Sequence, residues 1–265
     1  MKTMDLEIRR YLLTAYGESD RHSFNLEYDC DKSGECWDNY RQYSTGEAQM
    51  PYIPWIGERY DGLLFLGINF NGGNTDIDYC RHLKEEASER YLARNKYLIF
   101  RQPGYRGSPF WYYVALLGLL YQKYAAQSIR YSSESDVDAH MIKNGFRHCV
   151  FTNIVKCSTA NDGRSIPSDA MYENCSSKLT GELKVLKPKY IFSFTRHTYP
   201  DLLNRFERHH GRAKILDEKH RSRITQFDDF FFVEVEHPVS TAIHRGEKFD
   251  IYSNMIYRMI DLSRG

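Results

Sequence analysis

Short hydrophobic runs alternate along the chain with longer segments of helical periodicity. Four runs are rich in β-branched and aromatic side chains and have the length of buried strands. They are residues 63–68, 148–155, 190–194 and 230–236. Helical periodicity marks a second set of segments. These are residues 5–15, 110–122, 136–144, 168–186 and 249–262.

The clearest helix is expected over residues 168–186. Apolar side chains recur there at spacings of four, four, four and three residues, which places them on one helix face. They are Met171, Cys175, Leu179, Leu183 and Leu186. Ser168 follows Pro167 and is a suitable N-cap, and the pattern stops before Pro188.

The alternation of strands and helices predicts an α/β fold in which helices cover both faces of the sheet. We expect a three-layer αβα architecture with a central, mainly parallel, four-stranded sheet. No linker or repeat divides the chain, so a single domain is expected over residues 1–265, with residues 1–60 partly an N-terminal extension. Function is then expected at the carboxyl ends of the strands.

Composition and charge exclude several classes of protein. The 265 residues are 42% hydrophobic, with 36 basic against 35 acidic side chains, which excludes disordered and fibrous chains. The longest apolar stretches are far below the ~20 residues of a membrane span. The N-terminus MKTMDLEIRRYLL lacks the apolar core of a signal peptide. We therefore expect a cytoplasmic, monomeric protein that does not enter membranes, whose six cysteines are not disulfide-bonded.

Polar residues that can bind a ligand follow three of the predicted strands. A glycine-rich turn at residues 67–76 follows the first strand, and it is neither a P-loop nor a dinucleotide-binding motif. Asn153, after the second strand, offers a donor and an acceptor together, as reading the edge of a nucleobase requires. His237, after the last strand, can donate a proton or hydrogen bond to an oxygen that gains negative charge.

With these motifs the chain resembles the uracil-DNA glycosylase superfamily, in particular its iron-sulfur branch, over roughly residues 62–245. The sequence GINF, which begins at Gly67, is similar to the turn that handles the hydrolytic water, and this assigns Asn69 to positioning that water. FTNIVKC contains the base-reading residue, Asn153. HPVS, which begins at His237, is similar to the motif whose histidine stabilises the leaving base.

The resemblance also implies contacts with DNA, either single- or double-stranded. The loop after His237 corresponds to one that enters the duplex in the family. Its candidate DNA-binding residues are Ser240, Thr241, His244 and Arg245. An aromatic side chain should stack on the extruded base, for which Phe110 is the candidate and Phe70 the rival; Phe110 is otherwise an ordinary core residue at a helix start.

Two departures from the family bear on chemistry and specificity. Phe70 replaces the proline of the water-handling turn, which removes its backbone stiffness. Asn71 stands where uracil-strict members have a tyrosine that blocks bulk at the pyrimidine 5-position. No lysine occupies position 69, so hydrolysis without a covalent imine is expected, and Asn69 cannot act as a general base.

The cysteines extend the resemblance. Cys157 and Cys175 correspond to the second cysteine pair of the iron-sulfur branch, and Cys30 with Cys36 would supply the first pair, although the family has a closer C-x-x-C there. Four thiolates bind a [4Fe-4S] cluster, and zinc accepts the same set. Plain burial is the alternative, since Cys175 lies on the apolar face of its helix.

Two segments carry a local excess of positive charge. Residues 205–223 hold seven Lys and Arg against three Asp and Glu, and residues 94–106 hold four bases and no acid. Both are candidate contacts with the DNA backbone, Arg221 and Arg223 in particular, and solvated surface is the alternative for each.

The leading hypothesis is a monofunctional DNA glycosylase that hydrolyses the N-glycosidic bond of a flipped-out uracil or modified pyrimidine and leaves an abasic site, as in DNA repair. A second hypothesis is a glycosylase specific for a bulky modified cytosine of phage DNA, with a role in antiviral defence, which Phe70 and Asn71 favour. A third is a DNA-binding module on the same fold that has lost catalysis.

Overall fold

The computed structural model describes residues 32, 35, 54–68, 109–156, 169–196, 201–238 and 245–265. The strands are β1 (Trp55–Ile56), β2 (Leu63–Gly67), β3 (Cys149–Asn153), β4 (Tyr190–Ser193), β5 (Lys214–Lys219), β6 (Ser222–Gln226) and β7 (Phe231–Val235). The α-helices are α5 (Pro109–Gln127), α6 (Ala139–Ile142), α7 (Asp169–Leu186), α8 (Leu202–His210) and α9 (Arg245–Leu262). Two 3-10 helices, η1 (Glu134–Asp136) and η2 (Lys143–His148), flank α6.

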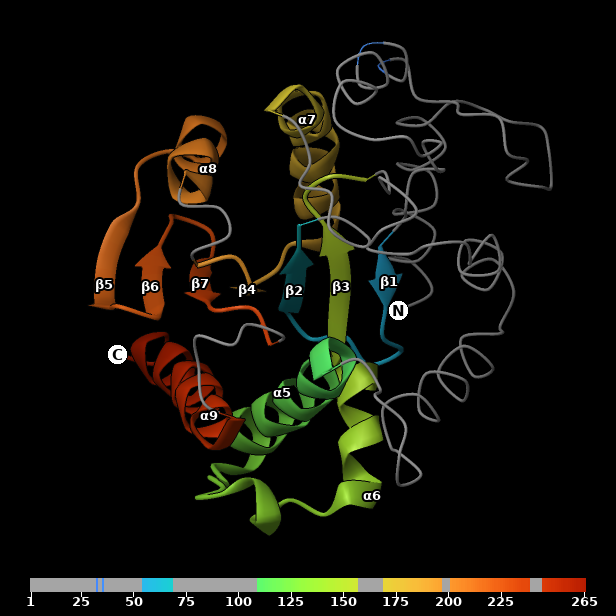
Figure 1. Cartoon of the computed structure of the whole chain (residues 1–265), viewed down its shortest axis with the longest axis vertical. Coiled ribbons are helices and arrows are strands. Elements are labelled where there is room, and N and C mark those ends of the chain that lie inside the picture. The colour runs from blue at the N-terminus through green and yellow to red at the C-terminus, as the bar shows by residue number, and fades with distance from the viewer. Residues whose placement is uncertain are drawn as a thin grey trace, which may run out of the picture. The chain divides into compact units, whose positions relative to one another are not determined.

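The α/β class is confirmed, and all four predicted strands are present as β2, β3, β4 and β7 (Figure 1). The prediction of a four-stranded, mainly parallel sheet is wrong. The sheet has seven strands in the order β1-β3-β2-β4-β7-β6-β5. β4 pairs in parallel with β2 and β7, whereas β6 pairs antiparallel with β5 and β7.

The added strands escaped prediction because they lack buried apolar runs. β1 has only two residues, and β5 has the sequence KILDEK with every side chain exposed or half-buried. Charged side chains and a register shift between Ile215 and Asp217 mark β5 as a protected edge strand. The periodic pattern therefore predicts the buried centre of the sheet and misses its rim.

The chain divides into two compact units. One comprises residues 1–55, 67–92 and 151–187, and the other comprises residues 56–66, 93–150 and 188–265. The boundary falls within β2, before its last residue, and within β3, after its second residue. Each unit is described by itself below, and the single domain expected from the sequence stays a prediction.

In the second unit, aromatic side chains pack helices onto both faces of β4 and β7. Tyr190 contacts Tyr121 of α5 at 5.6 Å between ring centroids, so its face of β4 is covered by α5. Phe232 pairs with Ile191, the residue after Tyr190, and therefore points to the opposite face. There it stacks on Phe206 of α8 at 4.6 Å.

The helical predictions are largely confirmed. α5, α7 and α9 occupy the expected segments, with α5 and α9 somewhat longer than predicted. The segment at 136–144 contains the short α6, with 3-10 helix before and after it, and α8 was not predicted. The helix expected at residues 5–15 lies outside the described residues. No helix in the described part of the chain is long and apolar enough to cross a membrane.

The backbones of α5 and η2 approach each other so closely that glycine is required at the contact. A Cβ atom at Gly145 would lie 1.8 Å from the carbonyl oxygen of Ala115, and one at Gly118 would lie 2.4 Å from the carbonyl oxygen of Gly145. η2 leads directly into β3, so this contact anchors the start of that strand.

We expect Gly145→Ala to lower the free energy of unfolding by about 1–3 kcal/mol, since the backbones must separate to admit the methyl group. Urea denaturation measures this. Gly265→Ala is the matched control, because nothing lies within 4 Å of a Cβ at that position. Equal midpoints for the two variants would contradict the close contact.

Candidate functional site

Asn153 is the last residue of β3, and its side chain lies against Gly67, the last residue of β2. A Cβ at Gly67 would be only 2.3 Å from Asn153 Oδ1, so any larger residue would displace the amide. Asn153 is 3% exposed, yet its Oδ1 has no hydrogen-bond partner among the described residues. A buried acceptor without a partner costs about 1–3 kcal/mol, which suits a group held ready for a ligand.

The backbone after Asn153 is tied to the backbone after β2. The amide of Ile154 donates to the carbonyl of Gly67 at 2.9 Å, and the amide of Val155 donates to the carbonyl of Ile68 at 2.8 Å. Successive residues after β3 bind successive residues from the end of β2, so the two segments run in the same direction. The Asn153 amide therefore projects from a segment whose main chain is fixed.

Three side chains form a buried polar cluster beneath this segment. Lys156 Nζ donates to Glu182 Oε2 and, at 2.7 Å, to Thr152 Oγ1; Thr152 Oγ1 donates to the same carboxylate oxygen at 2.8 Å. Lys156 is 1% exposed and Glu182 0%. Burial raises the pKa of the Glu182 carboxyl, and the neighbouring Lys156 charge opposes that rise. We call Thr152, Lys156 and Glu182 the buried cluster.

His237 follows β7 in the second unit, where its ring meets the ring of Phe194 edge to face at 6.5 Å. Burial, with a smaller contribution from the charge of Lys248, lowers the pKa of His237 to about 4. The imidazole is therefore neutral near pH 7. A neutral ring carries one N–H donor, which can stabilise an oxygen that gains negative charge without adding a full positive charge.

Hydrogen bonds to the main chain hold the segment around His237. Lys248 Nζ donates to the carbonyl of Pro238 at 2.6 Å, and the hydroxyl of Tyr252 donates to the carbonyl of Glu236 at 2.8 Å. Both donors lie on α9, so the helix fixes the residues on either side of His237.

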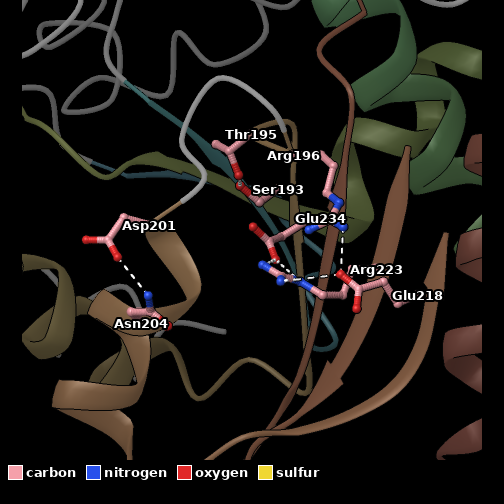
Figure 2. A network of polar contacts seen from close by, with 8 residues as sticks. All are labelled: Ser193, Thr195, Arg196, Asp201, Asn204, Glu218, Arg223 and Glu234. Atoms are coloured by element: carbon pink, nitrogen blue, oxygen red, sulfur yellow. Dashed lines mark hydrogen bonds and ion pairs between the residues drawn. The ribbon is translucent and has the colours of Figure 1, made fainter. Parts of the chain in front are cut away.

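A second set of charges lies at the carboxyl ends of β4 and β7, where Arg196 and Arg223 converge on the exposed Glu218 and the buried Glu234 (Figure 2). Arg223 Nε donates to Glu234 Oε2 at 2.7 Å, and Arg196 Nη2 donates to Glu218 Oε1 at 2.7 Å. Glu234 is 1% exposed, and burial raises the pKa of its carboxyl against the opposing charge of Arg223. We call these four residues the arginine network.

The strand register separates the basic segment 205–223 into two groups. Ser222 pairs with Val235, so the neighbouring Arg221 lies at the end of β7 that leads to His237. Lys214 pairs with Gln226, which pairs with Phe231 at the start of β7, about 13 Å away for four residues of strand. Within β5 and β6, the basic residues around Arg221 are thus at the end near His237, and Lys214 is at the other end.

Arg221 and Arg223, the two arginines of the basic segment predicted to bind DNA, differ in their surroundings. Arg223 is 11% exposed and bound to Glu234, so its charge is engaged inside the fold. Arg221 is 35% exposed and makes a looser ion pair with Glu247 at 3.4 Å. Of the two, Arg221 is the better placed to meet a phosphate.

Many of the predicted site residues lie outside the described part of the chain. They are Asn69, Phe70, Asn71, Ser240, Thr241 and His244, together with Cys30, Cys36 and Cys157. Phe110 is the second residue of α5 and Arg245 the first residue of α9, and only their backbones are described. The roles predicted for all these residues stay predictions.

Cys175 is the one predicted metal ligand that the structure describes. It is buried on α7, one turn from Met171 and Leu179. A buried cysteine at this position fits a cluster ligand, and it fits a core thiol as well. Among the described residues no group of His, Cys, Asp and Glu could hold a metal ion.

Sequence reasoning missed both charged residues of the buried cluster, and of the arginine network it singled out only Arg223, as a DNA contact. Signals for two of the missed residues were present. Glu182 falls seven residues after Cys175 on the apolar stripe of α7, and Glu234 interrupts the apolar run of β7. A charged residue on an otherwise apolar buried face requires a partner, which here is Lys156 or Arg223.

Known proteins give no further guide to the site. A scan against protein families found no matching family, and a search of curated protein sequences found no match.

The low pKa of His237 predicts how stability depends on pH. The unfolded imidazole takes up a proton near pH 6.5, whereas the folded one does so near pH 4. The unfolded state thus binds more protons between these values, so stability falls as the pH falls through this window, by on the order of 2–3 kcal/mol.

Urea denaturation at pH 7 and pH 4.5 should show a smaller loss of stability for His237→Asn than for the original protein. Variation of a solvated histidine, His209→Asn, serves as the control. If His237→Asn and the original protein lose the same amount, burial does not keep His237 neutral.

Proposed function

We propose that the protein is a DNA glycosylase of the uracil-DNA glycosylase type, which excises uracil or a modified pyrimidine. The observation that carries the proposal is the amide of Asn153, which is buried against Gly67 with its Oδ1 unpaired among the described residues. A nucleobase presents a donor and an acceptor on its Watson-Crick edge, and an Asn side chain matches both. This pairing would satisfy the unpaired acceptor.

The state of His237 supports the same reaction. Cleavage of an N-glycosidic bond leaves negative charge on the base, and a donor aimed at the base oxygen stabilises it most in the transition state. A neutral imidazole supplies that donor at neutral pH. Asn69 would orient the attacking water, as the resemblance implies.

The arrangement proposed for these residues is the three-layer αβα fold of that superfamily. Asn153 is the last residue of β3, and His237 follows β7. Ligands of α/β sheets bind outside the carboxyl ends of the strands. By the resemblance, Asn153 would read the extruded base and His237 would stabilise that base as it leaves, in a cytoplasmic and monomeric enzyme.

The proposed cofactor is a [4Fe-4S] cluster on Cys30, Cys36, Cys157 and Cys175, with zinc as the alternative. The burial of Cys175 fits such a ligand. The group would stabilise the fold around α7 and take no part in bond cleavage.

A modified cytosine is the second candidate substrate. Uracil and cytosine present the donor and the acceptor in opposite order, and an Asn amide can match either one by turning over. No described residue binds Asn153 Oδ1 and thereby fixes its orientation. Asn71, in place of a bulky tyrosine, would leave room for a substituent.

The test is an alkaline-cleavage assay on labelled single- and double-stranded DNA that contains uracil in one set and phage-type modified cytosines in another. The protein should cleave at one of these bases. Asn153→Ala and His237→Ala should each reduce cleavage by at least about 100-fold with little change in the urea midpoint. His209→Ala, at an exposed position on α8, is the control. Failure to cleave any of the bases by folded protein would reject the glycosylase in favour of a DNA-binding module.

Arg221 and Arg223 should respond differently to substitution. We expect Arg221→Ala to weaken DNA binding and to reduce the dependence of binding on salt by about one ion, as loss of one phosphate contact does. Arg223→Ala should chiefly destabilise the fold, because it leaves Glu234 buried without its partner. Fluorescence anisotropy at several salt concentrations and urea denaturation separate the two effects. Equal loss of DNA affinity with unchanged stability in both variants would contradict this division.

A further inference from the structure

Lys156 and Glu182 hold opposite charges inside the protein, at a position where apolar residues would serve stability as well. The side chains are 1% and 0% exposed. Removing such charges from water costs several kcal/mol each, and replacing a buried ion pair by apolar residues of similar size is often neutral or stabilising. The pair therefore invites a role other than stability.

The placement of the cluster around Asn153 indicates that role. Thr152 directly precedes Asn153, and Lys156 follows it by three residues. Both side chains bind one carboxylate oxygen of Glu182, which α7 carries. The cluster thus holds the chain before and after Asn153, the residue whose side-chain amide is proposed to read the base.

Main-chain hydrogen bonds also hold this segment, through Ile154 and Val155, to the end of β2. The amides of Ile154 and Val155 donate to the carbonyls of Gly67 and Ile68 at 2.9 and 2.8 Å. Hydrogen bonds to charged groups are directional and stronger than neutral ones, so they fix the segment in one arrangement where apolar packing would admit several.

We propose that Glu182 is a positioning residue which, through Lys156 and Thr152, fixes the segment after β3 so that the Asn153 amide meets the base in one geometry. The role in the reaction rests on the proposed function, whereas the fixing of the segment does not. A displacement of about 1 Å at a reacting group can cost about 100-fold in rate. Glu182 would thus act on the reaction without touching the substrate.

The first experiment measures the segment itself and needs no substrate. Lys156→Met with Glu182→Leu removes both charges together and keeps an apolar core. We expect hydrogen exchange at the amides of Ile154 and Val155 to become at least about ten-fold faster, while the urea midpoint is unchanged or higher. Lys184→Met, an exposed lysine of α7, is the matched control. Unchanged exchange in the double variant overturns the proposal.

If the double variant fails to fold, Thr152→Val tests the same point. Valine has nearly the shape of threonine and removes the shared hydroxyl without stranding a charge. Exchange at Ile154 and Val155 should then rise several-fold in a folded protein. Exchange equal to that of the original protein overturns the proposal.

The second experiment measures the link to catalysis on whichever base the cleavage assay identifies. The double variant should lose about 10- to 100-fold in kcat with KM nearly unchanged. In an Asn153→Ala background the same two substitutions should cause no further loss, because the cluster acts through that amide. Additive losses would show that the cluster supports the fold alone and overturn its positioning role. If the original protein cleaves no base, the proposed function fails, and the exchange experiment still decides whether the cluster fixes the segment.

Discussion

The structure depends on the rule that charges taken out of water must be paired. Among the described residues, Lys156 pairs with Glu182 in the first unit and Arg223 pairs with Glu234 in the second, in each case near the end of a strand. A broken pair would leave an uncompensated buried charge, which is strongly destabilising. Each pair therefore selects one arrangement of the chain around it. The chain near the ends of β3 and β7 is held by directional contacts in addition to hydrophobic packing, and these are the strands that Asn153 and His237 end or follow.

The amide of Asn153 differs from the two buried carboxylates, Glu182 and Glu234. Glu182 and Glu234 each have one carboxylate oxygen without a hydrogen bond in the described structure, but the second oxygen of each is bound by a cation. Asn153 has a single acceptor, and that acceptor is the unpaired one. Gly67 supplies the space it occupies, since a side chain there would collide with Oδ1. Gly67 on β2 thus leaves room for the Asn153 amide on β3, and the acceptor of that amide stays unpaired among the described residues. Such an arrangement is expected where a ligand completes the hydrogen bonding.

The sequence predicted those parts of the fold in which burial leaves a periodic record. β2, β3, β4 and β7 are largely buried and mostly apolar, and α7 has a mainly apolar stripe, so all five elements could be located. β5 and β6 could not, because their side chains are stabilised largely by pairing across strands, such as Arg223 with Glu234, and pairing depends on register. The same reason explains which features of the candidate site could be predicted from the sequence. Asn153 and His237 were found from their positions after strands, whereas the contact of Asn153 with Gly67 and the cluster beneath it arise from residues distant in sequence.

The two groups proposed to meet the substrate share one property, which is the absence of net charge. Asn153 is an amide, and burial keeps His237 neutral well below pH 7. The charges of Lys156, Glu182, Arg223 and Glu234 are paired with one another and serve to hold the chain. A neutral base bound by neutral donors and acceptors is selected by the pattern of hydrogen bonds, because a mismatched donor or acceptor is left unsatisfied in a buried site. In the proposed reaction the negative charge would appear only as the glycosidic bond breaks, and the hydrogen bond from His237 would then gain strength. Binding by neutral groups would thus serve recognition in the ground state and stabilisation in the transition state with the same few side chains.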